Sequence, residues 1–160
     1  MRAVVLLAVS CVAYGQYPTA QRYVDRLGAR LAAQSPETVR FSFRVVAGQS
    51  GSFTHEPQVQ AGGAILVPIN LLLAAQDEDE LAGMLAHSIA HVAAGHEARK
   101  RMVFGSSFGT REHWQADKEA VRLLTAAGFD ASALARYNER TNRWPASDPG
   151  RPTLTRRERE

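Results

Sequence analysis

The stretch DEDELAGMLAHSIAHVAAGHEARKR, residues 77–101, decides the fold because it predicts the clearest helix of the chain. Asp77 is a favoured N-cap residue, and Glu80, three residues later, is the matching partner of a capping box. Acidic residues fill the first turn and basic residues 99–101 the last, which suits the charges at the two ends of a helix dipole. One face of the predicted helix is apolar and comprises Leu81, Leu85, Ile89 and Val92.

Two histidines, His87 and His91, stand four residues apart in this predicted helix. On a helical wheel they lie about 40° apart, one turn from each other, on a different face from the apolar residues. Two imidazoles at this spacing can hold one metal ion, although histidines four apart also occur as ordinary core or surface residues. Ser88 follows the first histidine, where a zinc peptidase carries a glutamate. His96 falls on the core face, which favours a packed or hydrogen-bonded structural role.

A third candidate ligand stands on the next predicted helix, residues 111–128. His113 lies near the start of this helix, and Glu112 beside it is the alternative ligand of the segment. Asp117 lies four residues after His113 on the same face, so its carboxylate can accept the second N–H of a metal-bound histidine. With these residues, the histidine pair becomes a candidate metal site with three ligands.

Short strand candidates precede the histidine helix. Apolar side chains alternate in residues 41–47, FSFRVVA, as in a half-buried strand, and residues 62–68, GGAILVP, are a second candidate. Residues 48–58 between them have the composition of a loop. Further helices are predicted at residues 19–34, 70–76, 111–128 and 129–143, the last with Asp130 or Ser132 near its cap. Few strands followed by packed helices predict an α+β domain with a small antiparallel or mixed sheet packed on a helix bundle.

The composition is typical of a globular protein of one domain. The chain has 160 residues, of which 45% are hydrophobic and 22% are charged, so it can form a core without disulfides. The formal net charge is +3, and the densest basic cluster, RRERE at residues 156–160, contains acidic residues as well. A basic stripe with interleaved aromatic residues is missing from the sequence, which argues against nucleic-acid binding.

The N-terminus, MRAVVLLAVSCVAYGQ at residues 1–16, has the pattern of a secretory signal peptide. Arg2 provides the positive start, a short apolar run follows, and small residues up to Gly15 stand where a signal peptidase cleaves. The apolar run is too short to span a bilayer. No membrane span is therefore expected once the signal peptide has been removed.

This pattern predicts a signal peptide at residues 1–15 and a single domain at residues 16–160. The expected location is a bacterial periplasm or the cell exterior. Cys11, the only cysteine, offers a lipoprotein cleavage site as a minor alternative. Cleavage near residue 15 would leave a mature chain without disulfides or cysteine metal ligands.

Several motifs together resemble the HtpX-like, CAAX-endopeptidase-related family of zinc metallopeptidases. They include a Gly-Gly-x-Ile strand at residues 62–65, an acidic run before Glu-Leu-Ala, and Leu-Ala-His-x-x-x-His with a further histidine five residues on. An Ala-Asp pair followed by Ala-Gly-Phe-Asp completes the set. The likeness covers residues 20–150 approximately. It implies a zincin-like metallopeptidase domain in which the helix bundle carries the histidine helix.

The resemblance also implies roles for individual residues. One Zn²⁺ ion would be bound by His87, His91 and the residue three before Ala116, which is His113 here. A peptide or protein, as substrate or partner, would bind in extended form and pair with the strand at residues 62–67 as a sheet edge. The strand residues expected at this contact are Gly62, Gly63, Ala64 and Ile65.

The sequence departs from the family pattern at four places. Ser88 replaces the general-base glutamate, and His113 replaces a glutamate ligand. Residues 147–149, Ser-Asp-Pro, stand where many secreted members have Thr-His-Pro, and an Asn-Ala-Phe motif before the Gly-Gly strand is missing. A serine hydroxyl is not a usable base near neutral pH, and losing a positioned base costs about 10²- to 10⁴-fold in rate.

Three functions are compatible with these residues. The favoured one is an exported zinc metallopeptidase-family protein that binds zinc but is catalytically weak or inactive because of Ser88. The second is an active metalloendopeptidase with a three-histidine zinc-hydroxide site, since three imidazoles and a water are an established zinc ligand set. The third is a metal-free pseudoenzyme that binds a peptide or partner protein.

Overall fold

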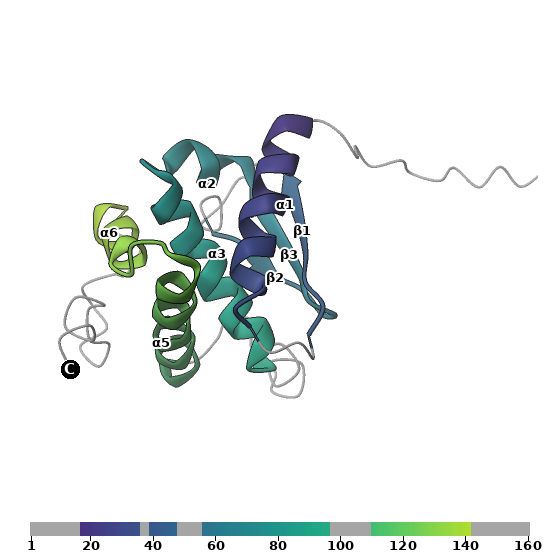
Figure 1. Cartoon of the computed structure of the whole chain (residues 1–160). Helices are drawn as coiled ribbons and strands as arrows, with labels where there is room; N and C mark the ends of the chain where they lie inside the picture. The colour runs from purple at the N-terminus through teal and green to yellow at the C-terminus, as the bar shows by residue number, and fades with distance from the viewer. Residues whose placement is uncertain (1–16, 36–38, 48–55, 97–109, 142–160) are drawn as a thin grey trace, which may run out of the picture.

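The computed structural model describes residues 17–35, 39–47, 56–96 and 110–141 (Figure 1). The predicted signal peptide, Cys11 and residues 147–149 lie outside these described residues. A helix-rich arrangement with one small mixed sheet confirms the predicted α+β class. Within the described ranges, no helix is both long enough and apolar enough to cross a membrane. In chain order the elements are α1 (Pro18–Ala32), β1 (Ser42–Val46), β2 (Gln58–Val59), β3 (Ala64–Pro68), α2 (Ile69–Ala74), α3 (Glu78–Ala93), α5 (Thr110–Ala127) and α6 (Ala133–Arg140).

The sheet has the strand order β1-β3-β2, so β3 is its central strand. β3 pairs in parallel with β1, where Phe43 is opposite Ile65, and antiparallel with β2, where Val59 is opposite Ile65. The prediction that residues 62–67 form an edge open to a peptide is therefore wrong, because a strand lies on each side of β3. Gln58 and Val59 supply the second neighbour and form the sheet edge themselves.

Helix α1 is fastened to the sheet through β1. The side-chain amide of Gln21 accepts the Val45 N–H at 2.8 Å and donates to the Phe43 carbonyl at 2.9 Å. These hydrogen bonds satisfy backbone groups on the outer side of β1, which is an edge strand. Unpaired backbone groups at a sheet edge can otherwise form hydrogen bonds with another chain. Gly28 lets the helix lie close, because a Cβ there would come within 2.4 Å of the Phe43 ring. The α1 side of the sheet is thus closed.

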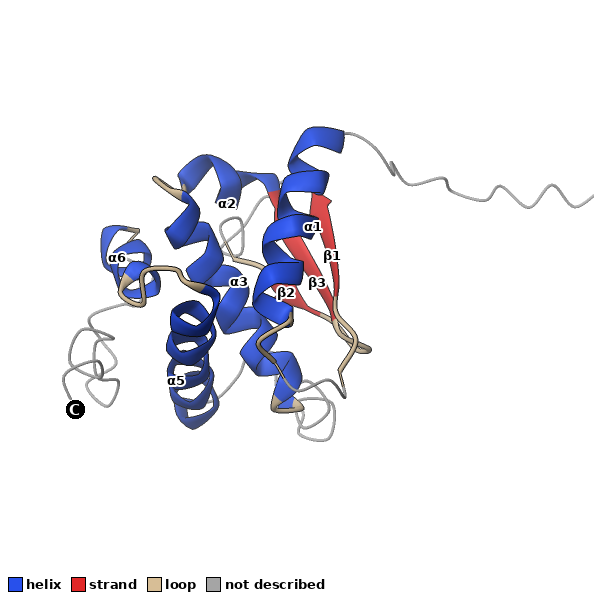
Figure 2. Ribbon diagram, in the orientation of Figure 1, coloured by secondary structure: helices blue, strands red, loops and turns tan. Residues whose placement is uncertain are grey.

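Helix α3 runs through the middle of the described structure, with α1 and the sheet on one side and α5 and α6 on the other (Figure 2). It is buried on nearly all sides, and even Glu80, Ser88 and His91 on it are buried. Gly83 permits the close approach of α6, because a Cβ there would lie 2.9 Å from the backbone of Leu134. The histidines of α3 therefore project from a helix that is packed from several directions.

The N-terminus of α3 forms as predicted in one half of its capping box. Oδ1 of Asp77 accepts the Glu80 N–H at 2.7 Å, which confirms the N-cap. The second half differs, because the Glu80 carboxylate accepts the N–H of Gln76, at 2.9 Å, one residue before the N-cap. Glu80 is buried and also pairs with Arg140 of α6. The residue predicted as a local cap thus also ties the start of α3 to α6.

Glycines end two of the helices. α3 ends at Ala93, and Gly95 follows with a φ of +64°, so the prediction of one helix to residue 101 is wrong. The left-handed conformation of Gly95 is the usual helix stop that only glycine adopts at little cost. α5 ends at Ala127, before Gly128 with a φ of +76°, as the sequence predicted. Because the chain turns at Gly95, His96 leaves the line of the helix.

The two glycines before β3 allow a matched test of the fold. Gly62 and Gly63 have φ values of +83° and +84°, but a Cβ at Gly63 would lie 2.0 Å from the Arg40 carbonyl oxygen, whereas one at Gly62 meets nothing within 4 Å. We expect Gly62→Ala to cost about 1 kcal/mol of backbone strain, and Gly63→Ala to cost about 3 kcal/mol because the overlap is added. Urea unfolding would measure both, and equal midpoints would show that the close approach to Arg40 is absent.

Candidate metal centre

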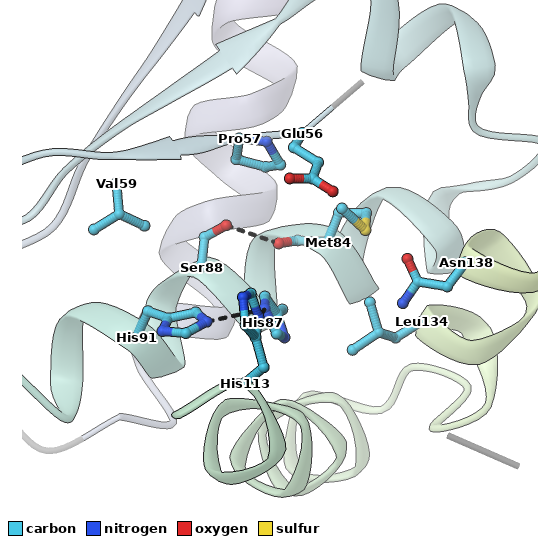
Figure 3. A pocket seen from close by; sticks show the side chains of 10 residues that line it. All are labelled: Glu56, Pro57, Val59, Met84, His87, Ser88, His91, His113, Leu134 and Asn138. Atoms are coloured by element: carbon cyan, nitrogen blue, oxygen red, sulfur yellow. Dashed lines mark hydrogen bonds between the residues drawn. The ribbon is translucent and has the colours of Figure 1, made fainter. Parts of the chain in front are cut away.

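Three histidines from two helices meet at one point in the described structure. His87 and His91 come from successive turns of α3, and His113 comes from the first turn of α5 (Figure 3). Nε2 of His91 lies 3.0 Å from Nε2 of His87, which lies 3.3 Å from Nδ1 of His113. One nitrogen of each ring lies within 4.8 Å of the other two. α3 fixes the spacing of the first pair, and its packing against α5 brings in the third.

Two of the three nitrogen–nitrogen separations are close to those of a tetrahedral zinc site. Zinc–nitrogen bonds of about 2.0–2.1 Å at tetrahedral angles place ligand nitrogens about 3.3 Å apart. The two separations given above, 3.0 and 3.3 Å, are close to this value. Three neutral imidazoles also leave a fourth position for water or substrate, which is the ligand arrangement of catalytic zinc sites. The residues present therefore fit the ion that the resemblance implies.

The outer nitrogens of both α3 histidines face buried side chains. Oδ1 of Asp117, which is 1% exposed, lies 2.8 Å from Nδ1 of His87. Nδ1 of His96, which is fully buried, lies 2.9 Å from Nδ1 of His91. Such partners fix the tautomer and orientation of a ligand histidine. With Nδ1 engaged outward, both rings present Nε2 to the point where His113 meets them.

The hydroxyl of Ser88 is hydrogen-bonded to the backbone of its own helix. Its Oγ donates a hydrogen bond to the carbonyl of Met84, one turn earlier on α3, at 3.0 Å. The residue is 3% exposed and lines the same pocket as His87 and His91. The α3 wall beside the histidines thus carries a short side chain that is bonded back to its own helix.

A pocket of about 70 Å³ opens beside the three histidines. Its walls come from α3, α5, α6 and the segment that leads into β2. Asn138 of α6 is 4% exposed, and its Nδ2 has no hydrogen-bond partner among the described residues. An unpaired buried donor costs about 1–3 kcal/mol, so this amide is a costly feature of the pocket. The residues that line the pocket are Glu56, Pro57, Val59, Met84, His87, Ser88, His91, His113, Leu134 and Asn138.

Comparison with known proteins places the chain in a family. The sequence model of Peptidase family M48 matches residues 18–107, which is more than half of the chain. The chain belongs to this family. A protein of Vibrio cholerae named as a beta-barrel assembly-enhancing protease is 36% identical over 84 residues, or 51% of this chain. The matched region is 16% of that longer protein, so the chain spans only a small part of its relative.

Membership of the M48 family agrees with the resemblance seen in the sequence. The structure shows where the residues of the motifs lie relative to the histidine cluster and the pocket. His113, and not its neighbour Glu112, belongs to the cluster of ligand nitrogens among the described residues. Gly62, Gly63, Ala64 and Ile65 do not line the pocket, which meets the sheet at β2 instead. The side chains that line the pocket thus differ from the set that was expected to contact a peptide.

Two residues of the pocket in this M48-family chain, Glu56 and Asn138, were not predicted from the sequence. Glu56 falls in a segment whose glycines, serine and threonine indicate only a loop. Asn138 lies in α6, more than twenty residues after His113, and nothing in its local pattern points to a site. Only the packing of α6 and β2 around α3 brings these two residues to the histidines.

Proposed function

We propose that this M48-family protein binds one zinc ion through His87, His91 and His113. The observation that carries this proposal is the clustering of three ring nitrogens within 4.8 Å of one another, with two of the separations, 3.0 and 3.3 Å, close to those of a tetrahedral ion. The contacts of Asp117 and His96 with the outer ring nitrogens support it further. A bound zinc ion would supply Lewis-acid chemistry, by polarising a carbonyl group and making a water more acidic.

We further propose that the protein is a weak metallopeptidase. Ser88 occupies the position of the family's general base, and its hydroxyl is bonded to the Met84 carbonyl. A positioned base contributes about 10²- to 10⁴-fold to the rate of a hydrolase. A three-imidazole ligand set offsets part of this loss, because neutral ligands leave more positive charge on the ion than a glutamate would. Slow cleavage of peptides is the activity that this site supports best.

Metal analysis of the purified protein tests the proposal. After dialysis against metal-free buffer, we expect one zinc ion to remain per chain, because three protein ligands and two outer partners hold it. A chain that retains no zinc would contradict zinc binding and peptidase activity together. The same sample, supplied with a fluorogenic peptide library, would then show slow cleavage that stops when a chelator removes the zinc.

The contact between Asp117 and His87 allows a graded prediction. Asp117→Asn keeps the shape of the side chain but removes the negative charge 2.8 Å from Nδ1 of His87. Loss of such an outer partner typically weakens metal binding by about 10- to 100-fold, and we expect a loss in this range. Competition with a chromophoric chelator measures it, with Glu119→Gln on the same helix as the control. Equal affinities of the two variants would show that Asp117 does not support the ligand.

The substrate or partner is proposed to be a peptide in extended form. β2 is the edge of the sheet on the pocket side, since Val59 of β2 lines the pocket. An extended peptide can add to such an edge by main-chain hydrogen bonds. Crosslinking of a bound peptide to Gln60, just after β2, would support this path, and crosslinking only to residues of β1 would contradict it.

Export to a bacterial periplasm or to the exterior is likewise a proposal. It rests on the basic start, the short apolar run and the small residues within residues 1–15. N-terminal sequencing of the protein recovered after expression in a bacterium tests it. A mature chain that begins near residue 16 and appears in the periplasmic fraction is expected, and an uncleaved cytoplasmic chain would contradict export.

A further inference from the structure

Besides Ser88, two polar side chains in the pocket lie outside the histidine cluster, and they come from different elements. Glu56 stands on the segment that leads into β2, and Asn138 stands on α6. Figure 3 shows the Glu56 carboxylate extending from the strand side into the space that Ser88 and the histidines also face. Most of the remaining lining is apolar, so these two groups are well placed to determine what a polar ligand meets there: Pro57, Val59, Met84 and Leu134.

The amide of Asn138 is the more telling of the two groups. It is 4% exposed, lines the pocket, and keeps an Nδ2 donor without a hydrogen-bond partner among the described residues. Buried donors are nearly always paired in native proteins, and an exception calls for an explanation such as a missing ligand. An N–H donor in a pocket beside a metal site is suited to an oxygen acceptor, such as the carbonyl oxygen of a peptide group.

Glu56 supplies the kind of group that α3 lacks. Ser88 is short and bonded to Met84, so no carboxylate from α3 enters the pocket. Glu56 lines the same pocket from a different element, but it is not among the three residues whose ligand atoms cluster within 4.8 Å. A carboxylate that lines the pocket outside the ligand cluster is placed to exchange protons with a bound water or substrate.

We propose that Glu56 and Asn138 complete the catalytic site of this chain, with Glu56 acting in place of the missing glutamate at position 88. This inference rests on the proposed zinc-dependent function. In peptide hydrolysis a water attacks the carbonyl carbon, and Glu56 accepts the proton that this water loses. Glu56 then gives that proton to the amide nitrogen as the C–N bond breaks, which yields a carboxyl group and an amine. Nδ2 of Asn138 donates a hydrogen bond to the carbonyl oxygen, where negative charge develops.

The test compares Glu56→Gln and Asn138→Leu with Glu139→Gln, an exposed carboxylate next to Asn138 on α6. Cleavage of a fluorogenic peptide library by the zinc-loaded full chain is expected to fall about 100-fold in kcat/KM for Glu56→Gln. A similar loss, of about 100-fold, is expected for Asn138→Leu. Zinc content should stay at one per chain in all three variants, because neither residue is a ligand.

Stability separates a catalytic role of Asn138 from a structural one. Leucine has a similar shape, and it removes a buried donor that has no partner among the described residues. The urea midpoint of the metal-free Asn138→Leu chain should therefore stay equal or rise, whereas loss of a structural hydrogen bond would lower it. A lowered midpoint, or cleavage that survives both substitutions, would overturn this inference alone. A zinc-loaded wild type that cleaves nothing would overturn this inference and the proposed peptidase activity together, but not zinc binding. Absence of zinc from the wild type would overturn the proposed function as well.

Discussion

Replacement of His113 by alanine is expected to weaken zinc binding by about 100-fold or more, so that the ion is lost on dialysis. Zinc sites with four protein ligands bind with about 10–16 kcal/mol, or about 3 kcal/mol for each ligand. Because 1.4 kcal/mol corresponds to a factor of ten, the loss of one ligand lowers the affinity about 100-fold. His113 is the contribution of α5 to the cluster, 3.3 Å from Nε2 of His87. Competition titration with a chromophoric chelator gives the affinity directly.

Glu112→Gln is the matched control for this substitution. Glu112 adjoins His113 on α5 and is the residue type that the M48 pattern would lead one to expect as a ligand. Its oxygens do not belong to the ligand cluster among the described residues, so this variant should keep its zinc. If Glu112→Gln lost the ion and His113→Ala kept it, the third ligand would be the carboxylate, and α5 would have to turn relative to α3. His91→Ala should behave like His113→Ala, because it also removes one ligand.

The local parts of the site could be read from the sequence because they depend on helix geometry. A spacing of four residues puts His87 and His91 on one face of any helix, whatever packs around it. The N-cap at Asp77 depends only on the residues that follow it, and it formed as predicted. The structure then places Asp117 beside His87, and this contact required knowledge of how α5 lies against α3. The sequence predicted Asp117 as a partner of a metal-bound histidine from its position four residues after His113, but this spacing did not indicate which histidine it would contact.

Most of the parts that failed depend on long-range packing. β2 is only two residues long, Gln58 and Val59, and a run this short carries no alternation to detect. Without β2, the strand at residues 62–67 was wrongly predicted as an edge. The helix that carries His87 and His91 was predicted to continue past Ala93, where α3 ends, because helix-forming residues on both sides of Gly95 outweighed this glycine as a stop signal. Glu56 and Asn138 escaped for the same reason as β2, since only tertiary contacts bring them to the pocket.

Ser88→Glu is expected to raise kcat/KM for peptide cleavage by the zinc-loaded protein about 100-fold. Ser88 lies on α3 between the two histidines of that helix and lines the pocket, so a glutamate there would place a carboxylate beside the site. A positioned base contributes about 10²- to 10⁴-fold, and the lower end applies because Glu56 already supplies part of this function. Ser88→Gln is the matched control, since it adds the same length without a carboxylate and should bring no gain. Steady-state kinetics on a fluorogenic peptide would measure both variants.

Ser88→Glu in a Glu56→Gln background tests whether a carboxylate on α3 and one on the strand side of the pocket can each act as the general base. A second carboxylate in a pocket of about 70 Å³ repels the first. Ser88→Glu should therefore lower the stability of a chain that keeps Glu56, and this loss of stability should be smaller when Glu56→Gln removes the first charge. In the Glu56→Gln background, Ser88→Glu should raise kcat/KM by a larger factor than in the wild type, because the pocket then has no other carboxylate to act as a base. If Ser88→Glu leaves kcat/KM unchanged in both backgrounds, the lack of a carboxylate at position 88 does not impair the site, and neither carboxylate position limits the rate. If Ser88→Glu raises kcat/KM only in the Glu56→Gln background, Glu56 alone is a sufficient base. The carboxylate that the family carries on the helix would then be supplied in this chain from the strand side of the pocket.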